Sequence, residues 1–203
     1  MAATTALVER IGTRTGVPFG RYGYTAALRP QLAHVPVIVP LAWFAMGVPA
    51  RETASAALGN RSTPITRLLL GSAALTAWDL FLDPQMVGEG YWRWQRRGRY
   101  RGIPATNYVG WFVTGLSVMA LLEVLLPADE QLPDPYLVGG YAYMATMETV
   151  GFAAFFRDPV VALAGGAAML PIAGQAIRRL LDWRHWSLGS GRPAIRGLPL
   201  CVR

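Results

Sequence analysis

AWDLFLDPQMVGEGYWRWQRRGRYRGIPATNYVGW, residues 77–111, joins the end of one apolar run to the start of the next. Asp79, Asp83 and Glu89 stand at the end of the first run, and tryptophans and a group of arginines follow them. The whole chain of 203 residues is 53% hydrophobic and only 15% charged. This composition is typical of a membrane protein, so the acids within residues 77–111 are the feature that needs an explanation.

Five segments are candidate membrane-spanning helices, which need about 20 mostly apolar residues. They are residues 34–50, 65–82, 108–126, 137–156 and 159–177. Apolar residues occur all round each segment, as in a spanning helix, and no segment alternates as a β-barrel strand does. The sequence therefore predicts an all-α fold, a polytopic transmembrane helical bundle in one integral-membrane domain over residues 1–203. An amphipathic or re-entrant segment is expected at residues 1–20.

The basic residues indicate a lipid partner. All 19 of them are arginines, and the formal net charge is +7. They lie between apolar segments and do not form the basic face of a soluble nucleic-acid-binding fold, so we expect anionic membrane lipid as their partner and no nucleic acid. Arginine bias places the loop 83–107 and the N-terminus in the cytoplasm. The tail from about residue 178 is also basic, so either the last segment is re-entrant around Pro171 or charge bias does not govern that end.

Asp79 and Asp83 are four residues apart, so their carboxyl groups share one face if the helix continues through both. Pro84 argues against this continuity, because proline disfavours helical geometry at the residue before it. Proline favours the first position of a new helix, and aspartate is a good N-cap. We therefore expect one span to end near Leu82 and an interfacial helix to begin at Pro84. In that arrangement Asp83 is either a structural cap or a functional acid.

Asp79, Glu123 and Glu148 lie within apolar segments. An acid near the bilayer core costs about 2.5–3.5 kcal/mol on insertion scales, so it faces the bundle interior and marks a site or a buried pair. The structural alternative for each acid is an ion pair with an arginine or a hydrogen bond to Ser, Thr or Tyr. For Glu123 this alternative has equal weight, whereas the functional interpretation is favoured for Asp79 and Glu148.

A carboxyl group buried without a cation keeps its proton at neutral pH and can donate it. Aromatic rings surround the acids in the sequence, and their faces attract cations. Together these features suit acid-catalysed chemistry on an alkene, in which a proton adds to one carbon and water captures the cation on its neighbour. The alternative for Trp92, Trp94 and Trp111 is an interfacial aromatic belt, to which we assign most of them.

The motifs of cofactor enzymes are missing from the sequence. His34 and His185 have no partner at metal-ligand spacing, and the single cysteine, Cys201, excludes a multi-cysteine metal site or an intrachain disulfide. No glycine-rich nucleotide fingerprint follows a strand. We therefore expect an enzyme that needs no cofactor and no metal.

Four motifs resemble the integral-membrane carotenoid hydratases, and together they cover about the first half of the chain. They are TGVPFGRYGYT (15–25), VPVIVPLAWFAMG (35–47), AWDLFLDPQMVGEGYWRW (77–94) and YRGIPATNYVGW (100–111). The resemblance implies a multi-pass enzyme of the cell membrane that adds water to the terminal C1–C2 double bond of an acyclic carotenoid, giving a 1-hydroxy carotenoid. Other carotenoid-biosynthesis enzymes are further expected partners. Members of that family carry additional apolar spans before TGVPFG, so this chain departs from the pattern at its start.

The resemblance and the chemistry together suggest roles for individual residues. Asp79 is expected as the general acid, Asp83 as its partner or the water-orienting base, and Glu89 as the second candidate acid. The expected substrate-binding residues are those that hold the water or surround the cation: Trp78, Tyr91, Trp92, Asn107, Trp111, Tyr24 and Glu148. We expect Arg21 in the first motif to pair with an acid.

Two other functions fit a membrane bundle with internal acids. A non-catalytic carotenoid-binding or scaffolding subunit would keep the pocket without the proton chemistry. A small transporter would use the acids as a proton relay and would be expected to show inverted repeats, which the sequence lacks. We prefer the enzyme.

Overall fold

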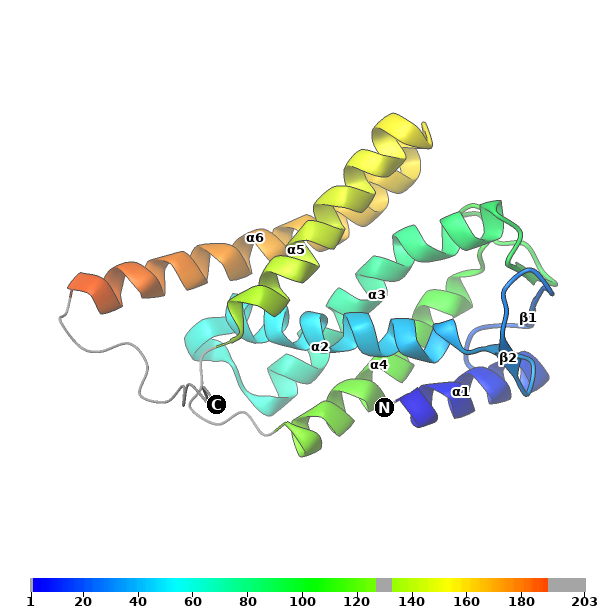
Figure 1. The fold of residues 1–203 in the computed structure, drawn as a ribbon, viewed down its shortest axis with the longest axis horizontal. Coiled ribbons are helices and arrows are strands. Elements are labelled where there is room, and N and C mark those ends of the chain that lie inside the picture. The colour runs from blue at the N-terminus through cyan, green and yellow to red at the C-terminus, as the bar shows by residue number, and fades with distance from the viewer. Residues whose placement is uncertain (1, 127–132, 190–203) are drawn as a thin grey trace, which may run out of the picture.

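The computed structural model describes residues 2–126 and 133–189, with side chains as far as residue 183. Six α-helices, two short helical turns and four short strands make up this part of the chain (Figure 1). The helices are α1 (Ala2–Thr15), α2 (Ile38–Leu58), α3 (Pro64–Gly88), α4 (Ala105–Leu125), α5 (Pro135–Val150) and α6 (Pro159–Gly189). The turns are η1 (Gly59–Arg61) and the π-helical η2 (Gly151–Phe155). The fold is mostly helical, as the composition predicts.

Helices occupy all five predicted spans, and three of these helices are long and apolar enough to cross a membrane: α3, α4 and α6. The first predicted span starts later than expected, because residues 35–36 belong to a strand and α2 begins at Ile38. Local chemistry sets several helix starts. Thr63 forms a capping box with Thr66, and the Asp134 side chain accepts a hydrogen bond from the backbone N–H of Tyr136 at the start of α5.

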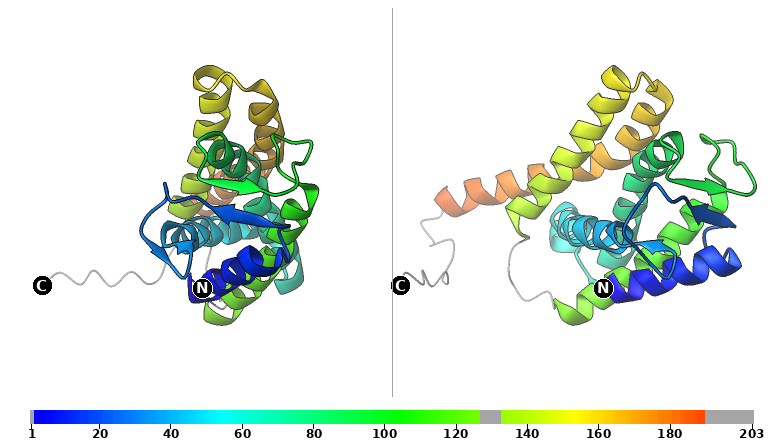
Figure 2. Two further views of the ribbon diagram at one scale, coloured as in Figure 1. Left: turned by 90° about the vertical axis from the view of Figure 1, so that its right-hand side faces the viewer. Right: turned by 45° about the vertical axis from the view of Figure 1, so that its right-hand side comes forward.

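Helix α3 is the centre of the bundle and packs against α2, α4 and α6. In Figures 1 and 2, α5 and α6 form a hairpin on one side of α3, and α1 lies on the other side. Small residues allow close helix approach at these contacts. A methyl group at Gly165 of α6 would lie 2.5 Å from the ring of Phe81, and one at Gly71 of α3 would lie 2.7 Å from Met119 of α4.

Large apolar side chains cover much of the outside of the helices. Leu163 of α6 is 72% exposed and Val124 of α4 is 77% exposed. A soluble monomer rarely exposes extensive apolar surface of this kind, whereas lipid tails solvate it well. The exposed surface therefore agrees with the three candidate transmembrane helices.

The predicted break at Leu82 is wrong, because α3 continues through Pro84 to Gly88. Proline lacks the N–H that would bond the carbonyl four residues earlier, which belongs to Leu80. The hydroxyl of Tyr100 donates to that carbonyl at 2.8 Å and replaces the missing bond. Burial raises the pKa of Tyr100 to about 12, so its hydroxyl remains a donor. Asp83 is consequently a residue of the helix interior and not an N-cap.

The expectation of an entirely helical chain is corrected by two small antiparallel ribbons. Strand β1 (Tyr22–Tyr24) pairs with β4 (Trp92–Trp94), and β2 (Gln31–Leu32) pairs with β3 (Val35–Pro36). In the first ribbon Tyr22 is opposite Trp94 and Tyr24 is opposite Trp92. This pairing joins the 15–25 motif to the loop after α3, and it forms the end of the bundle that carries the candidate site.

The last helix is continuous, so the re-entrant interpretation of the segment around Pro171 is wrong. Helix α6 runs through this proline as far as Gly189 and includes the first arginines of the basic tail, Arg178 and Arg179. The end of the tail, with Arg192, Arg196, Cys201 and Arg203, lies outside the described residues.

Candidate functional site

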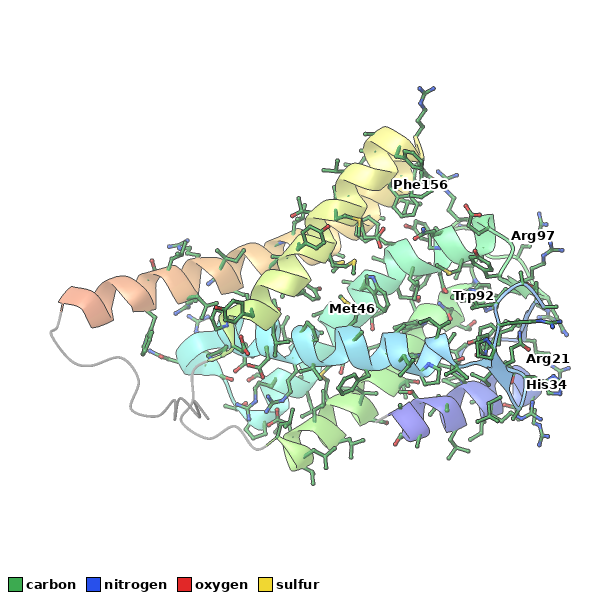
Figure 3. All side chains as sticks on the ribbon, in the orientation of Figure 1. Arg21, His34, Met46, Trp92, Arg97 and Phe156 are labelled. Atoms are coloured by element: carbon green, nitrogen blue, oxygen red, sulfur yellow. The ribbon has the colours of Figure 1, made fainter. Side chains whose placement is uncertain are left out.

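A cavity of about 180 Å³ lies at the end of the bundle where α1, the β1–β4 ribbon, α2, α3 and α4 meet. In Figure 3 this end carries the labelled Trp92, Arg21, His34 and Arg97. A water molecule needs roughly 10–15 Å³ measured in this way, so the cavity has room for an apolar group with water. We call it the aromatic cavity, after the rings that line it: Phe19, Tyr22, Tyr24, Trp43, Tyr91, Trp92, Trp94 and Trp111. Its polar lining residues are Glu9, Asp83 and Asn107.

The β1–β4 ribbon supplies half of these rings. Side chains alternate along a strand, so Tyr22 and Tyr24 share a face with Trp92 and Trp94 of the partner strand. Trp92 and Trp94 are buried, whereas Arg93 between them is exposed. The tryptophan N–H groups are used inside the site, because Trp92 donates to Asp83 Oδ1 at 3.1 Å. The expected interfacial belt is therefore wrong for these tryptophans, which lie within the protein.

Helices α2 and α4 complete the aromatic wall. Trp43 and Trp111 are stacked with ring centroids 3.9 Å apart, and both are buried. Trp78 is also buried and meets the edge of Trp111 at 6.1 Å, but it lies behind the wall and does not line the cavity. Phe19 is held between α1 and α4, because Gly110 leaves room for its ring; a methyl group there would lie 2.7 Å away.

Asp79 and Asp83 lie on one face of α3 and have Asn107 as a common partner. The side-chain nitrogen of Asn107 in α4 donates to Asp79 Oδ2 at 2.8 Å and to Asp83 Oδ2. All three side chains are buried, with exposed fractions of 0%, 2% and 2%. Only Asp83 and Asn107 reach the aromatic cavity, while Asp79 lies behind them with its Oδ1 atom unpaired among the described residues. We call Asp79 and Asp83 the acid pair.

Glu9 of α1 is a third buried acid at the aromatic cavity, and the sequence interpretation missed it. Its Oε2 atom accepts hydrogen bonds from the hydroxyls of Tyr22 and of Tyr24, the latter at 2.7 Å, and its Oε1 accepts from Trp43 Nε1 at 3.0 Å. The side chain was missed because α1 buries Thr5, Glu9 and Gly12, whereas Leu7 and Ile11 are exposed. A polar stripe at helical spacing was the available signal.

Burial raises the pKa of Glu9 above its ordinary value of 4.5, and the bonds from Tyr22, Tyr24 and Trp43 oppose that rise. Burial and the charge of Glu9 also raise the pKa of both tyrosines. The phenols therefore remain protonated and act as donors to the carboxylate.

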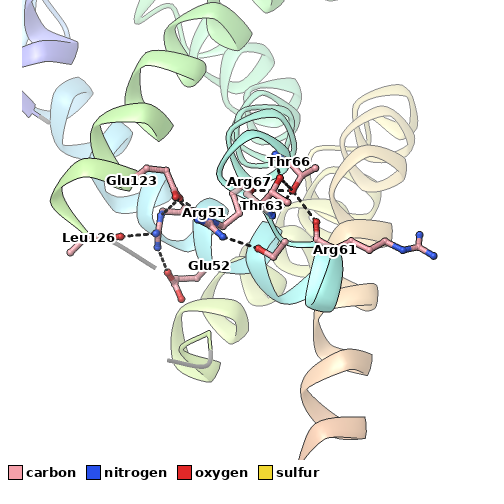
Figure 4. Close-up of polar contacts among 9 residues, drawn as sticks. Arg51, Glu52, Arg61, Thr63, Thr66, Arg67, Glu123 and Leu126 are labelled. Atoms are coloured by element: carbon pink, nitrogen blue, oxygen red, sulfur yellow. Dashed lines mark hydrogen bonds and ion pairs between the residues drawn. The ribbon is translucent and has the colours of Figure 1, made fainter. Parts of the chain in front are cut away.

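The remaining predicted acids lie away from the cavity. Glu89 is exposed at the C-terminal end of α3, and Glu148 is half-buried on α5 and does not line the cavity. Glu123 accepts from Arg51 Nε at 3.0 Å and from Arg67 at 2.9 and 2.5 Å (Figure 4). This ion pair is the structural alternative that the sequence left open for Glu123.

Among the other predicted binding residues, Tyr24, Tyr91, Trp92, Asn107 and Trp111 line the aromatic cavity. The expected ion pair of Arg21 is not found among the described residues, where its side chain is exposed. The described part of the chain also contains no cluster of three or more His, Cys, Asp or Glu side chains that could hold a metal ion.

Comparisons with known proteins agree with the resemblance seen in the sequence. Residues 1–186 match the family model described as "Carotenoid biosynthesis protein". Over 117 residues the chain is 38% identical to a bisanhydrobacterioruberin hydratase from Haloarcula japonica, an alignment that covers 57% of this chain and 39% of that protein. No solved structure matches the chain. Because the family model covers most of its length, the chain belongs to the carotenoid biosynthesis protein family.

Proposed function

We propose that the protein is a membrane enzyme that adds water to the terminal C1–C2 double bond of an acyclic carotenoid, giving a tertiary 1-hydroxyl group. The observation that carries this proposal is the acid pair, with one member on the wall of the aromatic cavity. Family membership supports a carotenoid substrate, and the name of the Haloarcula japonica protein supports hydration as the reaction.

The acid pair is suited to hold and deliver a proton. Two ionised carboxylates joined to one amide nitrogen inside an apolar bundle would repel each other, and a shared proton removes that repulsion. Asp83 reaches the cavity, so we assign it as the proton donor, with Asp79 as its partner behind the wall. This order reverses the roles expected from the sequence.

The reaction follows from these positions. The Asp83 carboxyl group gives its proton to C2 of the alkene, and the π electrons form the new C–H bond. The positive charge on tertiary C1 then lies among ring faces, which stabilise a cation by about 0.5–2 kcal/mol each. A lone pair of water forms the C1–O bond, and the water loses one proton. The product is the substrate plus one water molecule.

The location of the cavity suits an oily substrate and a water reactant. Ile38 of α2 lines the cavity and is 54% exposed, so the apolar lining reaches the surface of the protein. The arginine-bearing loop after β4 lies at the same end of the bundle (Figure 3). Arginines favour the headgroup region, where water meets hydrocarbon. A carotenoid end entering from the bilayer would therefore meet water at this level.

Expression in a lycopene-accumulating host tests the proposal. We expect a pigment heavier than lycopene by one water, and about 10²–10⁴-fold less of it with Asp83→Asn, the usual effect of removing a general acid. Asp182→Asn makes the same change at an exposed site on α6 and is the matched control. Unchanged lycopene that copurifies with the wild-type protein would instead identify a carotenoid-binding subunit.

A further inference from the structure

Glu9 faces the aromatic cavity from the wall formed by α1, whereas Asp83 faces it from α3. The two acids have different partners. Trp43 Nε1 can only donate a hydrogen bond, and the two phenols that contact Glu9 also donate, so both oxygens of Glu9 are acceptors. Three donors on one carboxyl group favour its ionised form. The acid pair has fewer donors for each carboxyl group: Asn107 donates to both, and Trp92 donates in addition to Asp83.

No ion pair to Glu9 is found among the described residues, although Glu123 in the same structure is paired with Arg51 and Arg67. A buried carboxylate without a cation is costly, and a charge-neutral residue would fill the same space at lower cost. A buried, unpaired carboxylate in the wall of a cavity is typical of a functional residue and not of a residue that stabilises the fold.

We propose that Glu9 is the general base of the hydration, which binds the attacking water and takes its proton. The inference rests on the proposed function and assigns the two proton transfers to two different acids of the cavity lining, Asp83 of α3 and Glu9 of α1. Asp83 loses a proton to C2, the water oxygen bonds to C1, and the O–H bond of that water breaks as its proton passes to a Glu9 oxygen. Glu9 then releases the proton to solvent and Asp83 regains one, so no other reactant is consumed.

The three donors position this base. Tyr22 and Tyr24 come from β1 and Trp43 from α2, so they hold the carboxylate from two elements, and one lone-pair site of Oε1 is left for water. Because burial raises the pKa of Glu9, its carboxylate is a stronger base than that of a free glutamate. Tyr22 and Tyr24 are the titratable groups in contact with Glu9, and Asp83 and Tyr91 line the same cavity.

Deuterium exchange separates the base from the acid. The purified full chain is incubated with lycopene in D₂O, and both the hydrated product and the recovered lycopene are analysed by mass spectrometry. For Glu9→Gln we expect hydration at least about 100-fold slower than in the wild type. The recovered lycopene should nevertheless gain deuterium, because Asp83 still forms the cation, which returns to alkene when water does not capture it. Asp83→Asn should show neither hydration nor exchange.

The alternative outcomes are distinct. Wild-type hydration by Glu9→Gln, or loss of both hydration and exchange in a variant that still binds lycopene, would overturn the role of Glu9. If the wild type forms no hydrated product, the proposed function itself is wrong. This outcome is recognised from the wild type alone, without the variants.

A second variant decides the question if Glu9→Gln does not fold. Tyr24→Phe removes one donor from Glu9 and leaves those of Tyr22 and Trp43 in place. Loss of a hydrogen-bond donor to the ionised carboxylate raises the pKa of the base. In a plot of hydration rate against pH, the rise on the acid side should therefore move to higher pH. An unchanged position of this rise would contradict the proposal.

Discussion

Glu123→Gln is expected to destabilise the protein without affecting its chemistry. Glu123 joins Arg51 of α2 and Arg67 of α3 to α4, and the two arginines are only 5% and 8% exposed (Figure 4). Without the Glu123 charge, the two arginines keep different sets of partners. Arg51 keeps Glu52 at 2.8 Å and the carbonyl of Leu126 at 2.7 Å. Arg67 keeps the hydrogen bond to the Ser62 hydroxyl at 3.1 Å. It has no other ion pair among the described residues.

Breaking a buried ion pair by removing one partner costs about 3–5 kcal/mol. We expect the lower end of this range, because Glu123 is only partly buried and Arg51 still has the Glu52 carboxylate as a partner. At roughly 2–4 °C per kcal/mol for a chain of this size, about 3 kcal/mol corresponds to a midpoint that is about 6–12 °C lower. The measurement is thermal or denaturant unfolding of the purified protein in detergent, with hydration of lycopene measured per folded molecule.

The double variant Glu123→Gln with Arg67→Met provides the control. It removes the uncompensated charge together with its partner, so the two effects should be non-additive by about 1–3 kcal/mol and stability should partly recover. A single-variant loss below about 1 kcal/mol, or strict additivity, would refute the structural role. Loss of hydration in molecules that remain folded would return Glu123 to the list of candidate acids.

Three further predictions concern the elements around the cavity. Tyr100→Phe should cost about 1–3 kcal/mol of unfolding free energy, because the α3 carbonyl left free by the internal proline loses its partner. Gly110→Ala places a methyl group 2.9 Å from the Pro18 backbone and should cost about 1–3 kcal/mol, whereas Gly139→Ala, with nothing within 4 Å, should not destabilise. Folding raises the pKa of Glu9, so the folded state binds more protons and wild-type stability falls as pH rises from 4.5 through the folded pKa. Unfolding curves of Glu9→Gln across pH should lack this decline.

The helices could be predicted from the sequence because apolar runs of spanning length leave few alternatives in a bilayer. The ends of the helices were less predictable than their positions. Pro84 has the local chemistry of a helix start, but a tyrosine from the following loop compensates the missing hydrogen bond, and this contact spans twenty residues of sequence. The strands β1 and β4 are only three residues each, too short for alternation to be recognised before their pairing is known.

The candidate site could be predicted where acids interrupt apolar runs. Asp79, Asp83 and Asn107 lie together, because the first two are one helical turn apart and α4 packs on α3. Glu9 could not be identified by the same rule. Its helix carries apolar side chains on the exposed face, and its buried face consists of small and polar residues, the reverse of a soluble amphipathic helix.

Oxygen labelling of the product tests the central claim most directly. The purified protein is given lycopene in H₂¹⁸O under ordinary oxygen, and the pigment is analysed by mass spectrometry. Hydration through the acid pair predicts a product with one ¹⁸O in its new hydroxyl group and no requirement for O₂. A product that carries only ¹⁶O, or lycopene that is bound and recovered unchanged, would contradict the account.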